Sequence, residues 1–277
     1  MYPIGLSSCS KSPDEAFFVS CRDAGITAVE ISPTLAECPG LPFEKIKDYA
    51  GAAGVQLWSF HLPFMPFDEI DVSSTDETLR LSSVSYDAHL IRKAAAIGIR
   101  IFVIHASGEP IADAERPLRM AAAKKSLAAL AEEAASCGGV LAVENLPRTC
   151  LGKDSAEILE LLSADRRLGV CFDTNHLLSE SGESFVRAAG SKIVTLHVSD
   201  YDKIDEKHWL PGEGVTDWQA LYTEIRNAGY GGVWMYELGY GPTASRPRVR
   251  PLTPSDFVKN AEEIFNGRPL SVLPTIR

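Results

Sequence analysis

The sequence predicts an α/β protein that folds as a single (β/α)8 TIM barrel domain over residues 1–277. Short apolar runs alternate with longer helical patterns from one end of the chain to the other, as in consecutive β-α units. Each run is almost continuously apolar, which is typical of parallel strands covered on both faces. Eight such units without a Gly-rich dinucleotide-binding loop favour a closed barrel over an open doubly wound sheet.

The elements follow in order along the chain. The expected strands are the apolar runs at residues 2–6, 27–31, 55–60, 100–104, 140–144, 168–172, 193–197 and 232–237. The first helix has its start signal at residues 12–15, where we expect Ser12 as N-cap and Glu15 as the partner in a capping box. Further helices are expected from start signals and helix propensity, near residues 76–97, 118–136, 154–162 and 254–266. Glycines separate several helices from the next strand, where a left-handed residue ends the helix, as at positions 25, 54, 98, 138 and 229.

Composition and charge exclude several classes of protein. The chain has 27 Lys and Arg against 37 Asp and Glu, a net charge of −10, so neither nucleic acid nor an anionic membrane is an expected partner. No apolar run approaches the roughly 20 residues that span a bilayer, and no signal peptide precedes the first strand. The six cysteines are scattered and are expected to be reduced thiols, so we expect a cytoplasmic protein.

Polar residues gather at the carboxyl ends of the expected strands, which meet at one mouth of such a barrel. Five of the six histidines lie at or after strand ends, at positions 61, 105, 176, 197 and 208. Carboxylates occupy other strand ends, at Glu30, Glu144, Asp173 and Glu237. Buried charges need partners, so this convergence predicts a cation or a polar ligand. A ligand set of carboxylates and imidazole without thiolate suits Mn²⁺, Mg²⁺ or Co²⁺, with Zn²⁺ as an alternative.

Five short motifs at successive strand ends extend this pattern. They are Val143-Glu144-Asn145, Phe172-Asp173-Thr174-Asn175-His176, Leu196-His197-Val198-Ser199-Asp200, the run HWLPGEG at 208–214, and Tyr236-Glu237. Together they resemble the xylose-isomerase-like TIM-barrel superfamily, which includes the sugar phosphate isomerases and epimerases and endonuclease IV. Each motif is weak alone, but their order and spacing extend the resemblance over essentially the whole chain.

The resemblance implies a metal-dependent sugar isomerase or epimerase acting on a small carbohydrate. It implies one divalent cation, Mn²⁺ by preference, held by Glu144, Asp173, His197 and Glu237. The two glutamates are also the acid/base pair of the sugar epimerases. This agrees with the chemistry of the residues, since a cation acidifies the proton next to a ketose carbonyl and stabilises the enediolate, while two carboxylates exchange protons.

Further residues near the mouth are candidates for binding the substrate. We expect His61, His105, His176 and His208 to contact substrate hydroxyls, with Arg148 and Trp58 as additional contacts. A surface ion pair for Arg148 and core packing for Trp58 are the structural alternatives. The arginines at 246, 248 and 250 could form a lid, a subunit contact in a homo-oligomer or a solvated loop. The tail after Gly267 is either a packing arm or a disordered end.

Two other functions remain open. In endonuclease IV a trinuclear zinc cluster also uses histidines equivalent to these, together with an Asp-x-His pair. Here Glu206 stands where that pair has aspartate, and its longer side chain puts the third metal in doubt. The acidic balance also argues against a phosphodiester of DNA as substrate. A metal-free binding subunit on the same barrel would be favoured by loss of a metal ligand, and all four are present.

Overall fold

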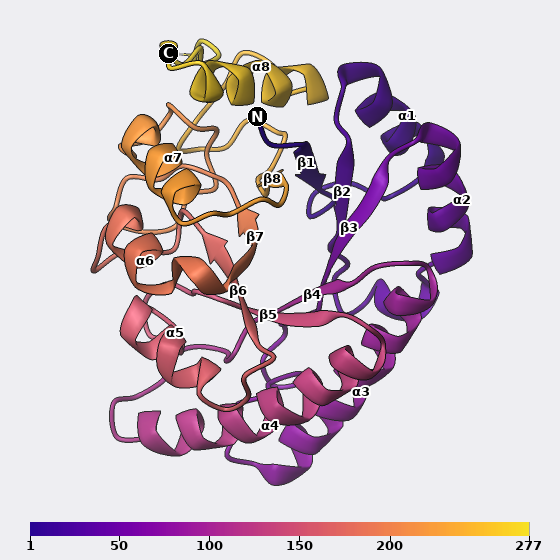
Figure 1. Cartoon of the computed structure of the whole chain (residues 1–277), viewed down its shortest axis with the longest axis vertical. Helices are drawn as coiled ribbons and strands as arrows, with labels where there is room; N and C mark the ends of the chain where they lie inside the picture. The colour runs from indigo at the N-terminus through magenta and orange to yellow at the C-terminus, as the bar shows by residue number, and fades with distance from the viewer. Residues whose placement is uncertain (277) are drawn as a thin grey trace.

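The computed structural model describes residues 1–276 and confirms the (β/α)8 barrel (Figure 1). Its strands are β1 (Ile4–Ser7), β2 (Ala28–Ile31), β3 (Gln56–His61), β4 (Ile101–Ile104), β5 (Val140–Glu144), β6 (Gly169–Asp173), β7 (Ile193–His197) and β8 (Trp234–Tyr236). They pair in parallel in the order β7-β6-β5-β4-β3-β2-β1-β8. Val198 N–H donates to the Met235 carbonyl (2.8 Å), which joins β7 to β8 and closes the ring.

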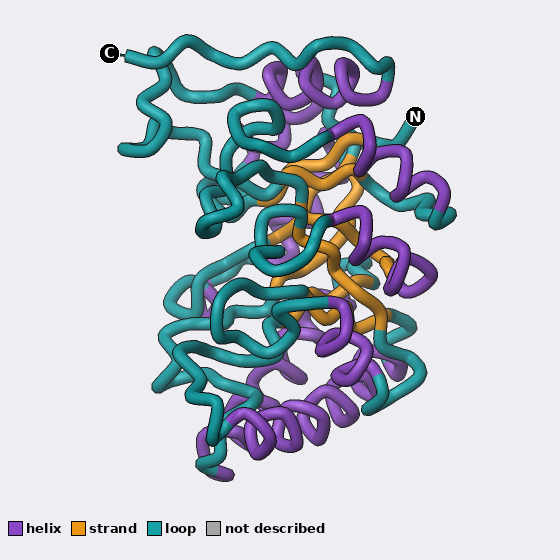
Figure 2. The backbone as a smooth tube through the Cα atoms, turned by 90° about the vertical axis from the view of Figure 1, so that its left-hand side faces the viewer, coloured by secondary structure: helices purple, strands orange, loops and turns teal. Residues whose placement is uncertain are grey.

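One helix follows each strand and packs on the outside of the barrel (Figure 1). The helices are α1 (Glu15–Ala24), α2 (Phe43–Ala53), α3 (Glu77–Ala96), α4 (Arg116–Ser136), α5 (Ser155–Leu162), α6 (Gly182–Ala189), α7 (Trp218–Asn227) and α8 (Pro254–Phe265), with short 3-10 turns at Cys38–Gly40 and Gly190–Lys192. The loops that follow the strands gather on one side of the molecule, opposite the side where the N-terminus lies (Figure 2). That side holds the carboxyl ends of the strands.

Capping side chains begin most helices as expected, with one correction. Asp76, Asp154 and Thr253 are N-caps, and Thr253 forms a capping box with Asp256. The expectation that Ser12 caps the first helix is wrong. Asp14 is the N-cap, because its carboxylate accepts from the Phe17 N–H (2.9 Å) and the helix begins at Glu15.

The C-terminal tail is a packing arm. Leu270 and Leu273 pack against the main hydrophobic core, and the Ile276 N–H donates to the Pro247 carbonyl (2.7 Å). Arg248 is also buried, and its guanidinium forms a bidentate ion pair with Glu213 at 2.6 and 2.8 Å. The alternative of a solvated loop is therefore wrong for Arg248, and a lid or subunit contact by this segment stays a prediction.

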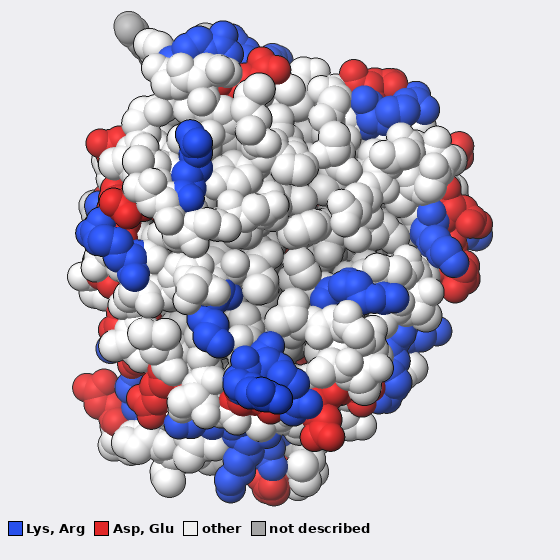
Figure 3. All heavy atoms as spheres, in the orientation of Figure 1, with Lys and Arg blue, Asp and Glu red and all other residues white. Residues whose placement is uncertain are grey.

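Charged side chains are unevenly spread over the surface seen in Figure 3. On the face seen in Figure 3, positive and negative side chains are mixed around the edge and the centre is mostly uncharged. Within residues 1–276, no helix is long and apolar enough to cross a membrane.

Candidate active site

The carboxyl ends of four consecutive strands bring one set of ligand-type side chains together. One donor atom from each of Glu144, Asp173, His197 and Glu237 lies within 4.8 Å of the others. Glu144, Asp173 and His197 end strands β5, β6 and β7, and Glu237 directly follows β8. All four side chains are buried. These are the four residues that the sequence analysis expects as metal ligands.

Asn145 fixes the neighbouring ends of β5 and β6. Its side-chain Nδ2 donates to the backbone carbonyl of Asp173 (2.9 Å), and its side-chain Oδ1 accepts from the backbone N–H of Asp173 (2.8 Å). The Asp173 carboxylate accepts through Oδ1 from the Asn175 N–H (2.6 Å). Its other oxygen, Oδ2, is buried and has no hydrogen-bond partner in the described part of the chain. A buried acceptor without a donor is costly, so Oδ2 is suited to a cation.

Two histidines approach Glu144 from the ends of β3 and β4. Nε2 of His61 lies 3.1 Å from Oε2 of Glu144, and Nε2 of His105 lies 3.2 Å from the same oxygen. The Nδ1 atom of His61 lies 2.8 Å from the Leu62 carbonyl. Both nitrogens of His61 therefore face acceptors, so the ring carries two protons unless a cation lies between it and Glu144.

Two more histidines approach the site from the loops after β6 and β7. Nδ1 of His176 lies 2.9 Å from the Asn145 carbonyl and 3.6 Å from Glu144. Nδ1 of His208 lies 3.2 Å from the Glu237 carbonyl. The side chain of Asn175 holds the second loop in place, because its carbonyl oxygen accepts from the His208 N–H (3.2 Å). All four histidines expected to bind substrate thus lie at one mouth.

The charges of these groups depend on one another. Burial alone lowers the pKa of His61, but the bonded carboxylate of Glu144 raises it to about 9. Burial also opposes charge on His176, yet Asp173 raises its pKa to about 10. Burial raises the pKa of Glu144, but His197 and His105 hold it well below its ordinary value. Protonated histidines therefore balance the carboxylates, and a divalent cation can replace their protons.

Four further groups of ligand-type side chains overlap or adjoin the four-residue set, and two of them bear on a second cation. His176, Glu206 and His208 offer donor atoms within 4.8 Å of one another, and so do His61, His105 and Glu144. Nε2 of His176 lies 3.2 Å from Oε2 of Glu206, so the longer glutamate does reach this histidine. The arrangement has donors for more than one cation.

The sequence matches a family model over most of its length. Residues 18–253 fit the model described as xylose isomerase-like TIM barrel. The chain belongs to this family. A curated relative, "Uncharacterized protein MJ1311" of Methanocaldococcus jannaschii, is 25% identical over 177 residues. That match covers 61% of this chain and 60% of the relative's length.

Several solved structures share the fold of this chain. A D-tagatose 3-epimerase-like protein is 21% identical, with a TM-score of 0.75 over 85% of this chain and 90% of its own. An L-ribulose 3-epimerase is 20% identical, with a TM-score of 0.70 over 86% of this chain and 82% of its own. D-psicose 3-epimerase from Clostridium cellulolyticum H10 is 18% identical, with a TM-score of 0.73 over 96% and 92%. At these identities the likeness establishes the fold.

Arg148 lies at the mouth but is fully engaged by acidic residues. Its guanidinium pairs with Glu109, with Asp205 (2.7 Å) and with Glu206 (2.9 Å). These ion pairs raise its pKa, with the bond to Glu109 contributing most. An anionic substrate would have to displace one of these carboxylates. Contact between Arg148 and substrate stays a prediction.

Trp58 points into the barrel rather than outward. Between Val29 and Glu30, β2 shifts its register against β3 so that Trp58 is left without a partner. Its ring packs with Ala28, Val233 and Met235, and its N–H donates to Thr195 Oγ1 (3.0 Å). Thr195 lies two residues before His197 on β7, so the ring supports the strands that end at the site. Sugar contact by Trp58 stays a prediction.

Two residues at the site were given no role in the sequence analysis, although Glu30 was noted there as a strand-end carboxylate. Glu30 at the end of β2 is fully buried, and its Oε2 lies 3.0 Å from Nε2 of His197. Phe64 follows β3 and stacks on His105, with ring centroids 4.0 Å apart. Its spacing of three residues from His61 is the only sequence signal for it.

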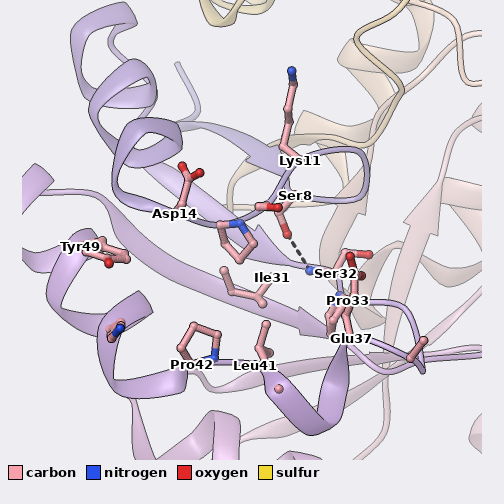
Figure 4. A pocket seen from close by; sticks show the side chains of 15 residues that line it. Ser8, Lys11, Asp14, Ile31, Ser32, Pro33, Glu37, Leu41, Pro42 and Tyr49 are labelled. Carbon is pink, nitrogen blue, oxygen red and sulfur yellow. Dashed lines mark hydrogen bonds between the residues drawn. The ribbon is translucent and has the colours of Figure 1, made fainter.

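A separate cavity of about 480 Å³ lies between the loops after β1 and β2 (Figure 4). Its wall includes Ser8, Lys11, Glu37 and Tyr49, and Ser8 Oγ accepts from the Ser32 N–H (2.9 Å). None of the histidines or carboxylates of the strand-end cluster is among its lining residues. It does not belong to the cluster described above.

Proposed function

We propose that this protein is a divalent-metal-dependent sugar isomerase or epimerase. The observation behind the proposal is the convergence of Glu144, Asp173, His197 and Glu237 at the ends of four consecutive strands. Similar solved structures include an L-ribulose 3-epimerase and a D-psicose 3-epimerase, which supports the same class. The expected substrate is a small carbohydrate with a carbonyl next to a hydroxyl-bearing carbon.

The donor set fits one divalent cation. It offers three carboxylates and one imidazole, and the buried Oδ2 of Asp173 has no hydrogen-bond partner among residues 1–276, with Nδ1 of His176 3.7 Å away. Such ligands suit Mn²⁺, Mg²⁺ or Co²⁺, with Zn²⁺ as an alternative. Mn²⁺ is the cation that the resemblance to the sugar epimerases favours. When bound, the cation would supply Lewis acidity toward the carbonyl and neighbouring hydroxyl of the sugar.

Glu144 and Glu237 are the proposed acid and base. One carboxylate removes the proton next to the carbonyl, giving an enediolate, and a carboxyl group returns a proton to the same carbon or its neighbour. His197 lies between them, with Nδ1 3.1 Å from Glu144 Oε1 and 3.2 Å from Glu237 Oε2. Return from the opposite face gives an epimer, whereas a shuttle along one face gives an isomer.

The surrounding histidines are the proposed contacts to the sugar hydroxyls. His61 and His105 face Glu144 from one side, and His176 and His208 face the site from the other. A neutral ring can donate to or accept from a hydroxyl group. Both nitrogens of His61 and of His176 already face protein acceptors, so each of these rings would exchange one protein contact for a sugar hydroxyl. A polyhydroxylated substrate matches such a ring of donors better than an apolar one does.

The test is proton exchange in a panel of free and phosphorylated ketoses. Protein reconstituted with Mn²⁺ is incubated with each ketose in D₂O and followed by ¹H NMR. We expect loss of the proton next to the carbonyl, with formation of an epimer or an aldose for at least one substrate. Removing the metal with EDTA should stop the exchange, and Mn²⁺ should restore it. Exchange that persists without metal would contradict the proposal.

A second candidate is an endonuclease IV-like phosphodiesterase with several zinc ions. The two additional groups of donors, each within 4.8 Å, favour it. The net charge of −10 and the pairing of Arg148 with three carboxylates argue against a polyanionic substrate. Cleavage of abasic-site DNA by the zinc-loaded protein, without exchange on any ketose, would favour this candidate.

A further inference from the structure

Glu30 makes a contact that the proposed chemistry does not use. Glu30 is the penultimate residue of strand β2, across the barrel from β7, and its side chain is completely buried. Oε2 of Glu30 lies 3.0 Å from Nε2 of His197 and accepts a hydrogen bond from Ser59 Oγ (2.7 Å). In the described residues, Oε1 of Glu30 has no hydrogen-bond partner. The contact with His197 is the only ion pair found for this carboxylate among residues 1–276.

The two nitrogens of His197 face opposite ways. Nε2 points to Glu30, whereas Nδ1 lies 3.1 Å from Glu144 and 3.2 Å from Glu237. A neutral imidazole has one donor and one acceptor nitrogen, and only the nitrogen without the proton can bind a cation. A carboxylate acceptor at Nε2 keeps the proton there and leaves the lone pair at Nδ1.

We infer that Glu30 is a positioning residue that sets the tautomer and orientation of His197 for metal binding. The inference rests on the proposed function, since it assumes the cation at Nδ1. The burial of Glu30 and its 3.0 Å contact with Nε2 of His197 support it, because a metal-binding histidine commonly donates its second ring N–H to a carboxylate. A purely structural role does not explain a buried carboxylate here, since an apolar side chain would avoid the cost of burying charge.

The test compares Glu30→Gln and Glu30→Met with the wild type. Glutamine keeps an acceptor oxygen but loses the charge, and methionine fills the space without an acceptor. Mn²⁺ affinity is measured by isothermal titration calorimetry, and the Tm of the metal-free protein is measured separately. We expect affinity to fall in the order wild type, Gln, Met, with a total loss of about 10- to 100-fold. The metal-free Tm should not follow that order.

Asp87→Asn is the matched control. Asp87 on α3 is also a buried carboxyl group, but it does not contact His197, so its variant should bind Mn²⁺ like the wild type. Wild-type affinity in Glu30→Gln and Glu30→Met would overturn the inference while leaving the proposed function intact. A parallel loss of Tm and affinity in both variants would also overturn it, in favour of a structural role. A wild type that binds no divalent cation would refute the proposed function together with this inference.

Discussion

His176 and Glu206 are hydrogen-bonded, with Nε2 of the histidine 3.2 Å from Oε2 of the glutamate. Arg148 binds the other oxygen of Glu206 at 2.9 Å. The bond from His176, followed by that from Arg148, outweighs burial and lowers the pKa of Glu206 to about 2. Three loops, those after β5, β6 and β7, are therefore joined by one carboxylate at the edge of the site. Both ring nitrogens of His176 therefore have a protein partner, Asn145 at Nδ1 and Glu206 at Nε2.

His176→Ala and His208→Ala should impair turnover without changing the number of bound metal ions. We expect kcat/KM to fall about 10- to 100-fold, since each variant loses a hydrogen bond to a substrate hydroxyl. Metal content is measured by elemental analysis after dialysis, alongside kinetics on the ketose identified by exchange. The control is His89→Ala, which removes an exposed histidine in the middle of helix α3 that does not belong to the strand-end cluster.

The metal content distinguishes the two candidate functions. One equivalent per chain in the wild type and in both variants agrees with a single cation at the four-residue set. Several equivalents in the wild type, reduced by His176→Ala or His208→Ala, would mean that His176, Glu206 and His208 hold a second ion. The histidines would then be ligands, contrary to the prediction.

Breaking the buried pair between Glu213 and Arg248 should destabilise the fold strongly. Both side chains are almost fully buried, so Glu213→Gln leaves an uncompensated guanidinium charge in the interior. We expect a loss of about 3–5 kcal/mol in the free energy of unfolding, measured by urea denaturation. The double variant Glu213→Leu/Arg248→Met should lose much less, because no lone charge remains. Equal losses in the single and double variants would contradict this account.

Strand ends could be predicted because their signals are local. Apolar runs and capping residues depend on neighbours in the sequence, and parallel strands place their carboxyl ends on one side. That geometry predicts that the polar strand ends share one mouth, whereas the choice of Glu144, Asp173, His197 and Glu237 as one ligand set came from the family resemblance. The Ser12 error has a local cause as well: Ser12 and Asp14 both favour N-cap positions, and only the three-dimensional bond to Phe17 N–H decides between them.

Side-chain partners across the barrel could not be predicted in the same way. Arg248 finds Glu213 35 positions away, and Glu30 finds His197 167 positions away. Trp58 turns inward because one strand shifts its register against the next. Such pairings depend on packing between distant segments, and a single sequence has no local pattern that reports them.

Asp256 should make stability depend on pH in the acid range. It accepts bonds from Arg250 and Thr253, which lower its pKa from 3.8 to about 2. A carboxyl group with a lowered pKa stabilises the fold above its unfolded pKa, so this contribution is lost as the pH falls from about 4 to about 2. The expected size is about 1 kcal/mol after allowance for solvent screening. Asp256→Asn should be less stable than the wild type at pH 7, and the difference should vanish near pH 2 in urea denaturation experiments.

The two glutamates of the site should be separable by replacing each with glutamine. Glutamine keeps an oxygen of nearly the same reach, so part of the Mn²⁺ affinity should survive, but it has no useful basicity near pH 7. Turnover should therefore fall about 100- to 10,000-fold in either variant, the range of a lost general acid or base. Both losses are measured on the same ketose, with calorimetry to confirm that metal is still bound.

Proton exchange into D₂O then tells which reaction the pair performs. If Glu144 and Glu237 lie on opposite faces of the sugar, each variant should still exchange the proton of one epimer and not of the other. In a shuttle along one face, one variant should lose exchange with both substrates and the other should keep it. The Glu30→Gln variant, which should weaken metal binding through His197, offers a comparison because it should slow both exchanges equally. Near-normal turnover in both glutamine variants would refute the role assigned to the glutamates. The proton-transfer role would then be assigned to a histidine, with His176 as the first candidate.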